Sequence, residues 1–168
     1  NNFYYEIAAT NQPQLIEGDS SIMVAQYFTS QGACGNGNPG DPEVIYLSAV
    51  EQNINTVLWN ATPNFAITTH WLNVVIPNGG TGISSFTYDG FPFGGFIPHP
   101  QDPNYSYLSI NVTPGPHIIR SDSGFNAIAY GFGNAESYGY NAGTNIKDLY
   151  QQIGVSTTYG IETTPSVC

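Results

Sequence analysis

The chain has 168 residues, which is within the usual size of one domain and long enough to bury a hydrophobic core. Twelve acidic residues oppose only two basic ones, Arg120 and Lys147, for a formal net charge of −10. Nucleic acid and anionic membrane surfaces are therefore excluded as partners, because binding to them requires clustered basic side chains. No run approaches the ~20 apolar residues of a membrane span, so membrane insertion is excluded as well.

Short segments rich in β-branched and aromatic residues alternate with clusters of Gly, Pro, Asn and Asp, which predicts an all-β protein. Near the C-terminus, apolar residues three or four positions apart predict one short helix over residues 144–153, packed on the sheets. The strands expected along the chain are residues 3–8, 21–28, 44–47, 56–59, 70–76, 86–88, 106–112, 115–121 and 125–131.

Alternation within the expected strands indicates one buried and one solvated face. In the segment 107–112, Leu108, Ile110 and Val112 fall on one face, while Ser109 and Asn111 fall on the other. The predicted fold is a two-sheet antiparallel β-sandwich with one short C-terminal helix.

The ends of the chain indicate a piece of a longer protein. The first residue is Asn rather than Met, and the last six residues read as a linker. We expect a single module over residues 1–162 and a linker over residues 163–168. Only 8% of residues are charged, against roughly 25% in an average soluble protein, which fits an exported, extracellular protein.

The two cysteines, Cys34 and Cys168, allow one disulfide within the chain. Such a bridge would close a long loop and contribute about 4 kcal/mol in the chain-entropy picture. Alternatively, Cys168 pairs with a residue beyond this chain. Neither cysteine has a second Cys or His at metal-binding spacing.

The segment AYGFGNAESYGYNAG, residues 129–143, begins like a dinucleotide fingerprint, because Gly131-Phe132-Gly133 follows an expected strand. The third glycine position of that fingerprint is Glu136, however, and no helix follows. We interpret the glycines as residues that allow tight backbone turns, and Tyr130, Tyr138 and Tyr140 as packing residues. A nucleotide site is not expected.

Catalytic and metal-binding patterns are weak. The three histidines lie far apart in the sequence, no nucleophile elbow is present, and so we expect no enzymatic activity and no zinc site. Asp41 and Glu43 in GDPE, with Glu51 nearby, form the densest acidic group. The structural interpretation is that Asp41 starts a turn. The functional alternative is a calcium site with carbonyl ligands from the Asn/Gly loop.

Aromatic residues near expected loops could form a flat platform for glycans. Trp59, Trp71 and Tyr105 are the candidates, although such residues more often pack in a core. A carbohydrate-binding module, with or without calcium, is therefore the alternative to a purely structural module.

Several segments together resemble the N-terminal domain family of IgG Fc-binding proteins. They are GDPEVIYLSAVEQNIN, WLNVVIP, TYDG, YSYLSINVTPGPHIIRSDSGFNAIAYGFGNAESYGYNAG and IKDLY, in the same order over residues 21–150. The version that this chain is most similar to occurs in large surface proteins of gliding gram-negative bacteria that are exported by the type IX pathway. One departure is Ala49, where the resemblance leads us to expect proline.

The resemblance implies an extracellular β-sandwich module, followed by immunoglobulin-like or PKD-like repeats that Cys168 would open. It further implies a non-enzymatic adhesion or structural role in a surface protein or filament, with neighbouring modules of the same assembly as partners. Antibody binding, the property in the family's name, is not implied for this chain.

Overall fold

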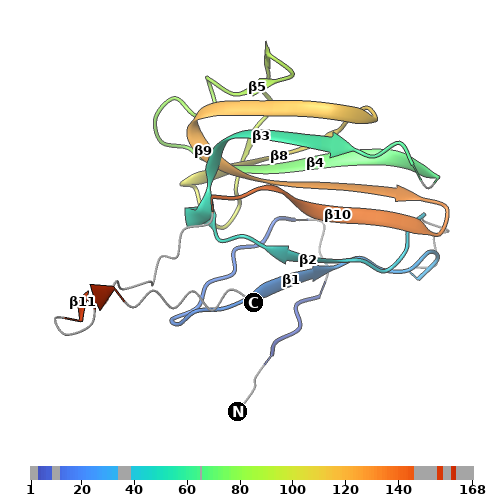
Figure 1. Cartoon of the computed structure of the whole chain (residues 1–168), viewed down its shortest axis with the longest axis horizontal. Coiled ribbons are helices and arrows are strands. Elements are labelled where there is room, and N and C mark those ends of the chain that lie inside the picture. Colours follow the sequence, from blue (N-terminus) through green and yellow to red (C-terminus); the bar gives the residue numbers. More distant parts are fainter. Residues whose placement is uncertain are drawn as a thin grey trace.

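The computed structural model describes residues 4–8, 12–33, 39–64 and 66–145, together with the backbone of residues 155–156 and 160–161. The described residues form an all-β structure with antiparallel strands (Figure 1), and one 3₁₀ turn, η1, is its only helical element. The elements in chain order are β1 Val24–Tyr27, β2 Val44–Leu47, η1 Val50–Gln52, β3 Ile54–Ala61, β4 Ile67–Pro77, β5 Thr87–Tyr88, β6 Phe91–Pro92, β7 Ile97–Pro98, β8 Tyr105–Asn111, β9 Gly115–Gly133, β10 Glu136–Gly143, β11 Val155–Ser156 and β12 Gly160–Ile161.

The long strand β9 is shared by two groups of strands. Its first half pairs with β3 on one edge and with β5, which continues into β6, on the other. Its second half pairs with β4 and β10, and β4 continues through β8 to β7. Figure 1 shows β9 curving between these two groups, which lie one over the other.

The prediction of two strands at 115–121 and 125–131 is wrong in one respect, because β9 runs through the polar residues between them. Ser121 donates its hydroxyl to the Gly82 carbonyl oxygen at 2.8 Å, and the Asp122 amide donates to the Ser85 hydroxyl at 2.9 Å. The register with β3 shifts at this point, which is a bulge. The polar residues therefore bend the strand without ending it, since the loop at 82–85 satisfies them.

The core lies between the inward faces of the two groups of strands. In β4, buried residues alternate with half-buried ones, as the sequence pattern predicts for a strand. The core cluster is Val57, Trp59, Ala61, Leu72, Val74, Ile76, Phe86, Leu108, Val112, Ile119, Phe125, Ala127 and Ala129.

The two-stranded ribbon of β1 and β2 packs beside β10 (Figure 1). Phe28, directly after β1, contacts the rings of Tyr130 and Phe132 at centroid distances of 5.7 and 5.3 Å. Ile45 of β2 is buried against the backbone of Gly139, where a Cβ would come within 2.5 Å of its side chain. Glycine at this position allows the ribbon to pack closely on β10.

The ends of the chain differ from the sequence expectations. Residues 4–8 form no strand, so the strand predicted at 3–8 is wrong for the described part of that segment. The predicted C-terminal helix is not seen: Thr144 and Asn145 are irregular, and residues 146–153 lie outside the described residues. The linker predicted at 163–168 lies outside them too. No helix of the described chain is long and apolar enough to cross a membrane.

The hydroxyl of Tyr140 closes the edge of β3. It accepts a hydrogen bond from the Asn60 amide at 3.3 Å and donates one to the Asn60 carbonyl oxygen at 2.6 Å. We expect Tyr140→Phe to lower the free energy of unfolding by about 1–2 kcal/mol, because two backbone groups lose their partner. Urea denaturation measures this loss. Tyr27→Phe, at a 75% exposed tyrosine, is the control and should change stability by less than about 0.5 kcal/mol.

Candidate functional site

Trp59, the first candidate for a glycan platform, lies in the core. Its side chain is only 4% exposed, and its ring lies 4.9 Å from the ring of His117 on the neighbouring strand β9. The expectation of an exposed aromatic plate is therefore wrong for Trp59. The alternation of β3 places positions 57, 59 and 61 inward, and Trp59 follows that pattern.

Trp71 and Tyr105 are half-buried on the same face of the β4–β8 pair, but at opposite ends of it. Trp71 pairs with Asn111, and Tyr105 pairs with Pro77. The six-residue separation along β4 corresponds to about 20 Å. The structure therefore does not bring these two rings together into one platform, and a glycan role for either residue alone stays a prediction.

Asp41 and Glu43 lie between the Asn/Gly loop and β2. The backbone amide of Asp41 donates to the Ser137 hydroxyl at 2.6 Å, which ties the loop to β10. The Glu43 carboxylate accepts a hydrogen bond from the Val44 amide at 3.1 Å. In the described part of the chain, no three His, Cys, Asp or Glu residues converge on a common point. Calcium binding stays a prediction, since residues 34–38 of the Asn/Gly loop lie outside the described residues. Both cysteines of the candidate disulfide, Cys34 and Cys168, also lie outside them, so neither of the two alternatives for Cys168 is tested.

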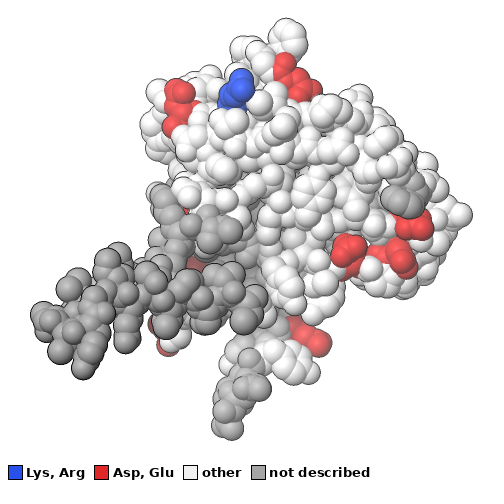
Figure 2. Space-filling model, in the orientation of Figure 1, with Lys and Arg blue, Asp and Glu red and all other residues white. Residues whose placement is uncertain are grey.

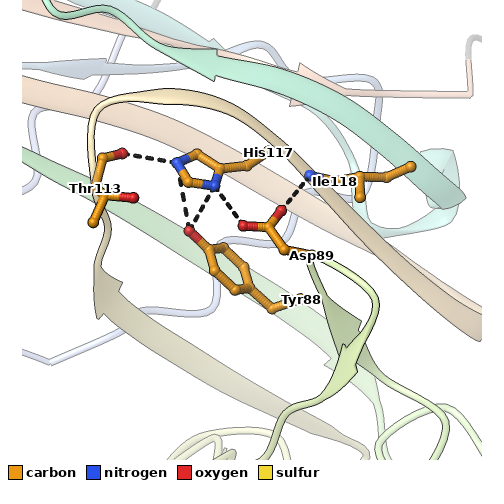
Figure 3. A network of polar contacts seen from close by, with 5 residues as sticks. All are labelled: Tyr88, Asp89, Thr113, His117 and Ile118. Atoms are coloured by element: carbon orange, nitrogen blue, oxygen red, sulfur yellow. Dashed lines mark hydrogen bonds and ion pairs between the residues drawn. The ribbon is translucent and has the colours of Figure 1, made fainter.

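A buried polar network joins the β5–β6 hairpin to β9 (Figure 3). Asp89 and Gly90 form its two-residue turn with φ values of 51° and 84°, as in a type I′ hairpin. Asp89 donates its amide to the Ile118 carbonyl oxygen at 2.8 Å and accepts the Ile118 amide on Oδ1 at 2.9 Å. The turn is thereby fixed to the backbone of β9.

His117 lies at the centre of this network and has a partner on each ring nitrogen. Nε2 donates to the Thr113 carbonyl oxygen at 2.7 Å. Nδ1 lies 2.8 Å from Asp89 Oδ2 and 2.8 Å from the Tyr88 hydroxyl (Figure 3). Nδ1 is therefore within hydrogen-bond distance of both the Asp89 carboxylate and the Tyr88 hydroxyl, and both ring nitrogens have partners within the fold.

Burial shifts the acidities in this network. Burial and the nearby charge of Asp89 raise the pKa of Tyr88 to about 12, so its hydroxyl stays protonated at neutral pH. Burial alone would raise the pKa of Asp89, but the hydrogen bonds from His117 and Ile118 and the charge of His117 together lower it below 3.8. The stability that ionised Asp89 contributes is thus present above that pH and is lost as the pH falls through the folded-state pKa.

His70 belongs to a second buried pair, with Tyr138 of β10. Its Nδ1 lies 3.1 Å from the Tyr138 hydroxyl, and its Nε2 is buried without a partner among the described residues. Burial, and secondarily the charge of His117, lower the pKa of His70 from its usual 6.5. The fold therefore favours the neutral ring.

We expect stability to fall as the pH drops below about 6.5, because the unfolded chain takes up a proton on His70 more readily than the folded chain does. The loss levels off once the pH is below the folded-state pKa. Melting temperatures from pH 8 to pH 4.5 measure this dependence. His70→Gln keeps a polar partner for Tyr138 and should flatten the profile between those limits. An equally steep profile in the variant would assign the dependence to other groups.

The outer face of β9 carries a polar depression of about 430 Å³ around Arg120. The antiparallel register places Arg120 directly between Thr56 of β3 and Thr87 of β5. Figure 2 shows one basic patch on this side with acidic patches on both sides of it, and that patch is Arg120 because Lys147 lies outside the described residues. The lining residues are Asn55, Thr56, Ser85, Thr87, Gly90, Arg120, Ser121 and Asp122.

This depression was not predictable from the sequence pattern alone. The one signal for it is Arg120 following the apolar Ile119 in an expected strand, which predicts an outward Arg120 side chain. The partners of Arg120 come from positions 56 and 87, and only the strand register brings them together.

A second, smaller groove of about 260 Å³ lies between the β1 side of the ribbon and the outer face of β4 and β9. Its lining mixes two polar side chains with four apolar or aromatic ones: Gln26, Phe28, Asn73, Ile128, Tyr130 and Phe132. The ring contacts of Phe28 with Tyr130 and Phe132 close one side of it. This groove is part of the packing of the ribbon on the sheet.

Two kinds of groups are therefore available for function. The buried groups of the His117 and His70 networks hold strands together, and they line neither the depression around Arg120 nor the groove beside the ribbon. The groups around Arg120 face solvent and supply hydrogen-bond donors and acceptors on a rigid sheet. Such a surface is suited to binding.

Comparison with known proteins identifies a family. No curated protein and no solved structure matches the chain. The family described as "IgGFc binding protein" matches residues 1–131, which include β1 to β8 and most of β9. Members of this family are typically extracellular or secreted, and membership indicates an extracellular binding module. The chain belongs to the IgGFc-binding protein family.

Proposed function

We propose that this chain is a non-enzymatic adhesion or structural module of a large cell-surface protein or filament, with neighbouring modules of the same assembly as its partners. The family match supports an extracellular binding module. The resemblance of the quoted segments to surface proteins of gliding bacteria supports a bacterial, type IX-exported context, and the two stacked groups of strands support a β-sandwich built for that role.

The observation that supports a non-enzymatic role is that the His117 network is buried and hydrogen-bonded within the fold. Acid, base and hydroxyl meet there, as they do in many catalytic sites. Every polar atom of the His117 ring has a partner within the fold, at 2.7 to 2.8 Å. A group that serves as general base must reach a substrate proton, and this ring is only 5% exposed. The network supports a structural role.

The outer face of the β1–β2 ribbon supports contact with other modules. Ile45 is buried on the inner face, and the pairing places Tyr27, Val44 and Tyr46 together on the opposite face. All three are exposed. An apolar face of this kind marks an interaction surface, and the low charge of the chain leaves few ions to desolvate when modules pack.

The test is the association of this chain with the adjoining segments of its full-length protein, measured by isothermal titration calorimetry. We expect saturable binding that Tyr27→Ser and Tyr46→Ser together weaken at least tenfold, because the ribbon face loses apolar area. Phe91→Ser, at an exposed aromatic residue away from the ribbon, is the control and should leave binding unchanged. Unaltered binding in the double variant, or turnover in a broad hydrolase screen, would contradict the proposal.

Glycan binding is the second candidate function, and the depression around Arg120 is the observation that favours it. Hydroxyl and amide side chains on a rigid strand surface are suited to sugar hydroxyl groups. A glycan array with and without a chelator tests this function and the calcium alternative together. Binding that survives chelation would separate glycan recognition from Asp41 and Glu43.

A further inference from the structure

We propose that the depression around Arg120 binds a sugar residue that carries a carboxylate, a uronic or sialic acid unit of an acidic glycan. This inference rests on the second candidate function, glycan binding, and names its site and its ligand class. It follows from the geometry of one row of side chains across β3, β9, β5 and β6.

The row is set by the register of these strands. Thr56 and Thr87 lie directly opposite Arg120 on its two neighbouring strands, and Pro92 lies opposite Thr87 on β6. Residues that are directly opposite share a face and stand about 5 Å apart. Arg120 therefore stands between two hydroxyl groups at a spacing that one sugar ring can bridge.

The Arg120 guanidinium is available to a ligand. It makes no hydrogen bond or ion pair with any residue in the described part of the chain, although Asp122 lies two positions further along β9 on the same side. Asp122 is held instead by the Thr81 hydroxyl, at 3.2 Å from its Oδ2. A planar guanidinium with free donors matches a carboxylate in bidentate geometry.

The surroundings are suited to the rest of a sugar. The Asn55 amide nitrogen donates to the Asp122 carbonyl oxygen at 2.8 Å, which holds that side chain at the rim of the depression. Leu58, two positions along β3 from Thr56 and on the same face, is 73% exposed and offers an apolar surface to sugar C–H groups. Hydroxyl groups beside an apolar surface are suited to a polyol.

The charge of the depression suits one negative group of a ligand at a time. Arg120 is the only basic side chain among the described residues, in a chain of net charge −10. Phosphate and nucleic-acid ligands carry more charge and require several basic groups. The depression, at about 430 Å³, lies in the range of small-ligand sites. A carboxylated sugar presents one charge and several hydroxyl groups, which is the complement of this row.

The experiment measures binding of the full chain to trigalacturonate and to methyl-α-sialoside by isothermal titration calorimetry. Methyl-esterified trigalacturonate, in which the carboxylates are masked, and a short peptide with a free C-terminal carboxylate are the comparison ligands. The variants are Arg120→Gln, Arg120→Lys, and Thr56→Val with Thr87→Val. Lys147→Gln removes the same charge from the other basic residue and is the control. Thermal melting confirms that each variant is folded.

We expect one of the acidic sugars to bind, and the ester and Arg120→Gln each to weaken binding about tenfold or more. The affinity of Arg120→Lys should lie between that of Arg120→Gln and that of the native protein. Lysine keeps the positive charge but cannot form two parallel hydrogen bonds to a carboxylate. The two acidic sugars distinguish uronic from sialic acid. Lys147→Gln should bind like the native protein.

Two results would overturn the inference without contradicting glycan binding. They are equal affinity for trigalacturonate and its methyl ester, or native affinity for the acidic sugar in Arg120→Gln. Tighter binding of the peptide than of either sugar would overturn it in favour of a protein ligand. If neither these sugars nor any glycan on the array binds, the inference and the second candidate function both fail, while the adhesion proposal keeps its own test.

Discussion

Phe125→Ala should lower the free energy of unfolding by about 3–5 kcal/mol, the usual cost of emptying a buried aromatic site. Phe125 is fully buried where β9 leaves its bulge. Its ring packs edge-on against Phe86 at a centroid distance of 5.7 Å, and Phe86 packs in the same way on Phe96 at 5.0 Å. Removing Phe125 therefore leaves a cavity and also ends a chain of three rings.

Chemical denaturation with urea measures this loss. Phe91→Ala is the matched control, since Phe91 is 75% exposed and lies outside the core cluster. It should cost less than about 1 kcal/mol. Similar losses in the two variants would contradict a core centred on Phe125.

Gly133→Ala should destabilise the protein by about 3 kcal/mol, the upper part of the range for overpacking a well-packed site. The reason is contact with backbone: a Cβ at this position would lie 2.1 Å from the carbonyl oxygen of Ala66. Backbone at a strand end cannot move away as a side chain can. Glycine in GFG is therefore needed for the close approach of β9 and the start of β4, and not for a phosphate.

Thermal unfolding of the variant, with Gly94→Ala as control, measures this effect. A Cβ at Gly94 meets nothing within 4 Å, and its φ is not in the left-handed region, so alanine there should be neutral or slightly stabilising. A Gly133→Ala protein as stable as the native one would show that the turn at residues 134–135 can shift, and would remove the steric explanation.

Strands with clear alternation were predictable from the sequence. The segment 44–47 has the predicted bounds, the segment 70–76 lies within the longer β4, and β8 is shifted one residue toward the N-terminus from the predicted 106–112. The reason is physical: these strands bury one face only, so period-two alternation appears directly in the sequence. The fully antiparallel, all-β class follows from many such segments.

β10 was the main omission, because its glycines look like turn residues. Gly139 and Gly143 lie in this strand at places where a Cβ would meet the side chains of Ile45 and Val57 at 2.5 and 2.7 Å. Glycine here serves close packing between layers. Which side chain lies over a glycine depends on the tertiary fold, and no local pattern contains that information. The interpretation of Tyr130, Tyr138 and Tyr140 as packing residues agrees with their ring contacts.

The candidate site was less predictable than the fold. Trp59 was selected for its residue type, although its position in the alternation of β3 points inward. The sequence alone shows Arg120 only as one of two basic residues. The neighbours of Arg120 in the depression are set by the long-range register of the strands, which places positions 56, 87 and 120 in one row.

The most direct test is an NMR titration of the ¹⁵N-labelled chain with trigalacturonate and with methyl-α-sialoside, in which protein and sugar signals are followed together for a day. A sugar site at Arg120 on a module without catalytic activity predicts saturable shifts at Thr56, Thr87 and Arg120 with one of the two sugars, and unchanged sugar spectra throughout. New sugar signals would contradict a module without catalysis, and shifts absent from these three residues with both ligands would contradict the sugar site.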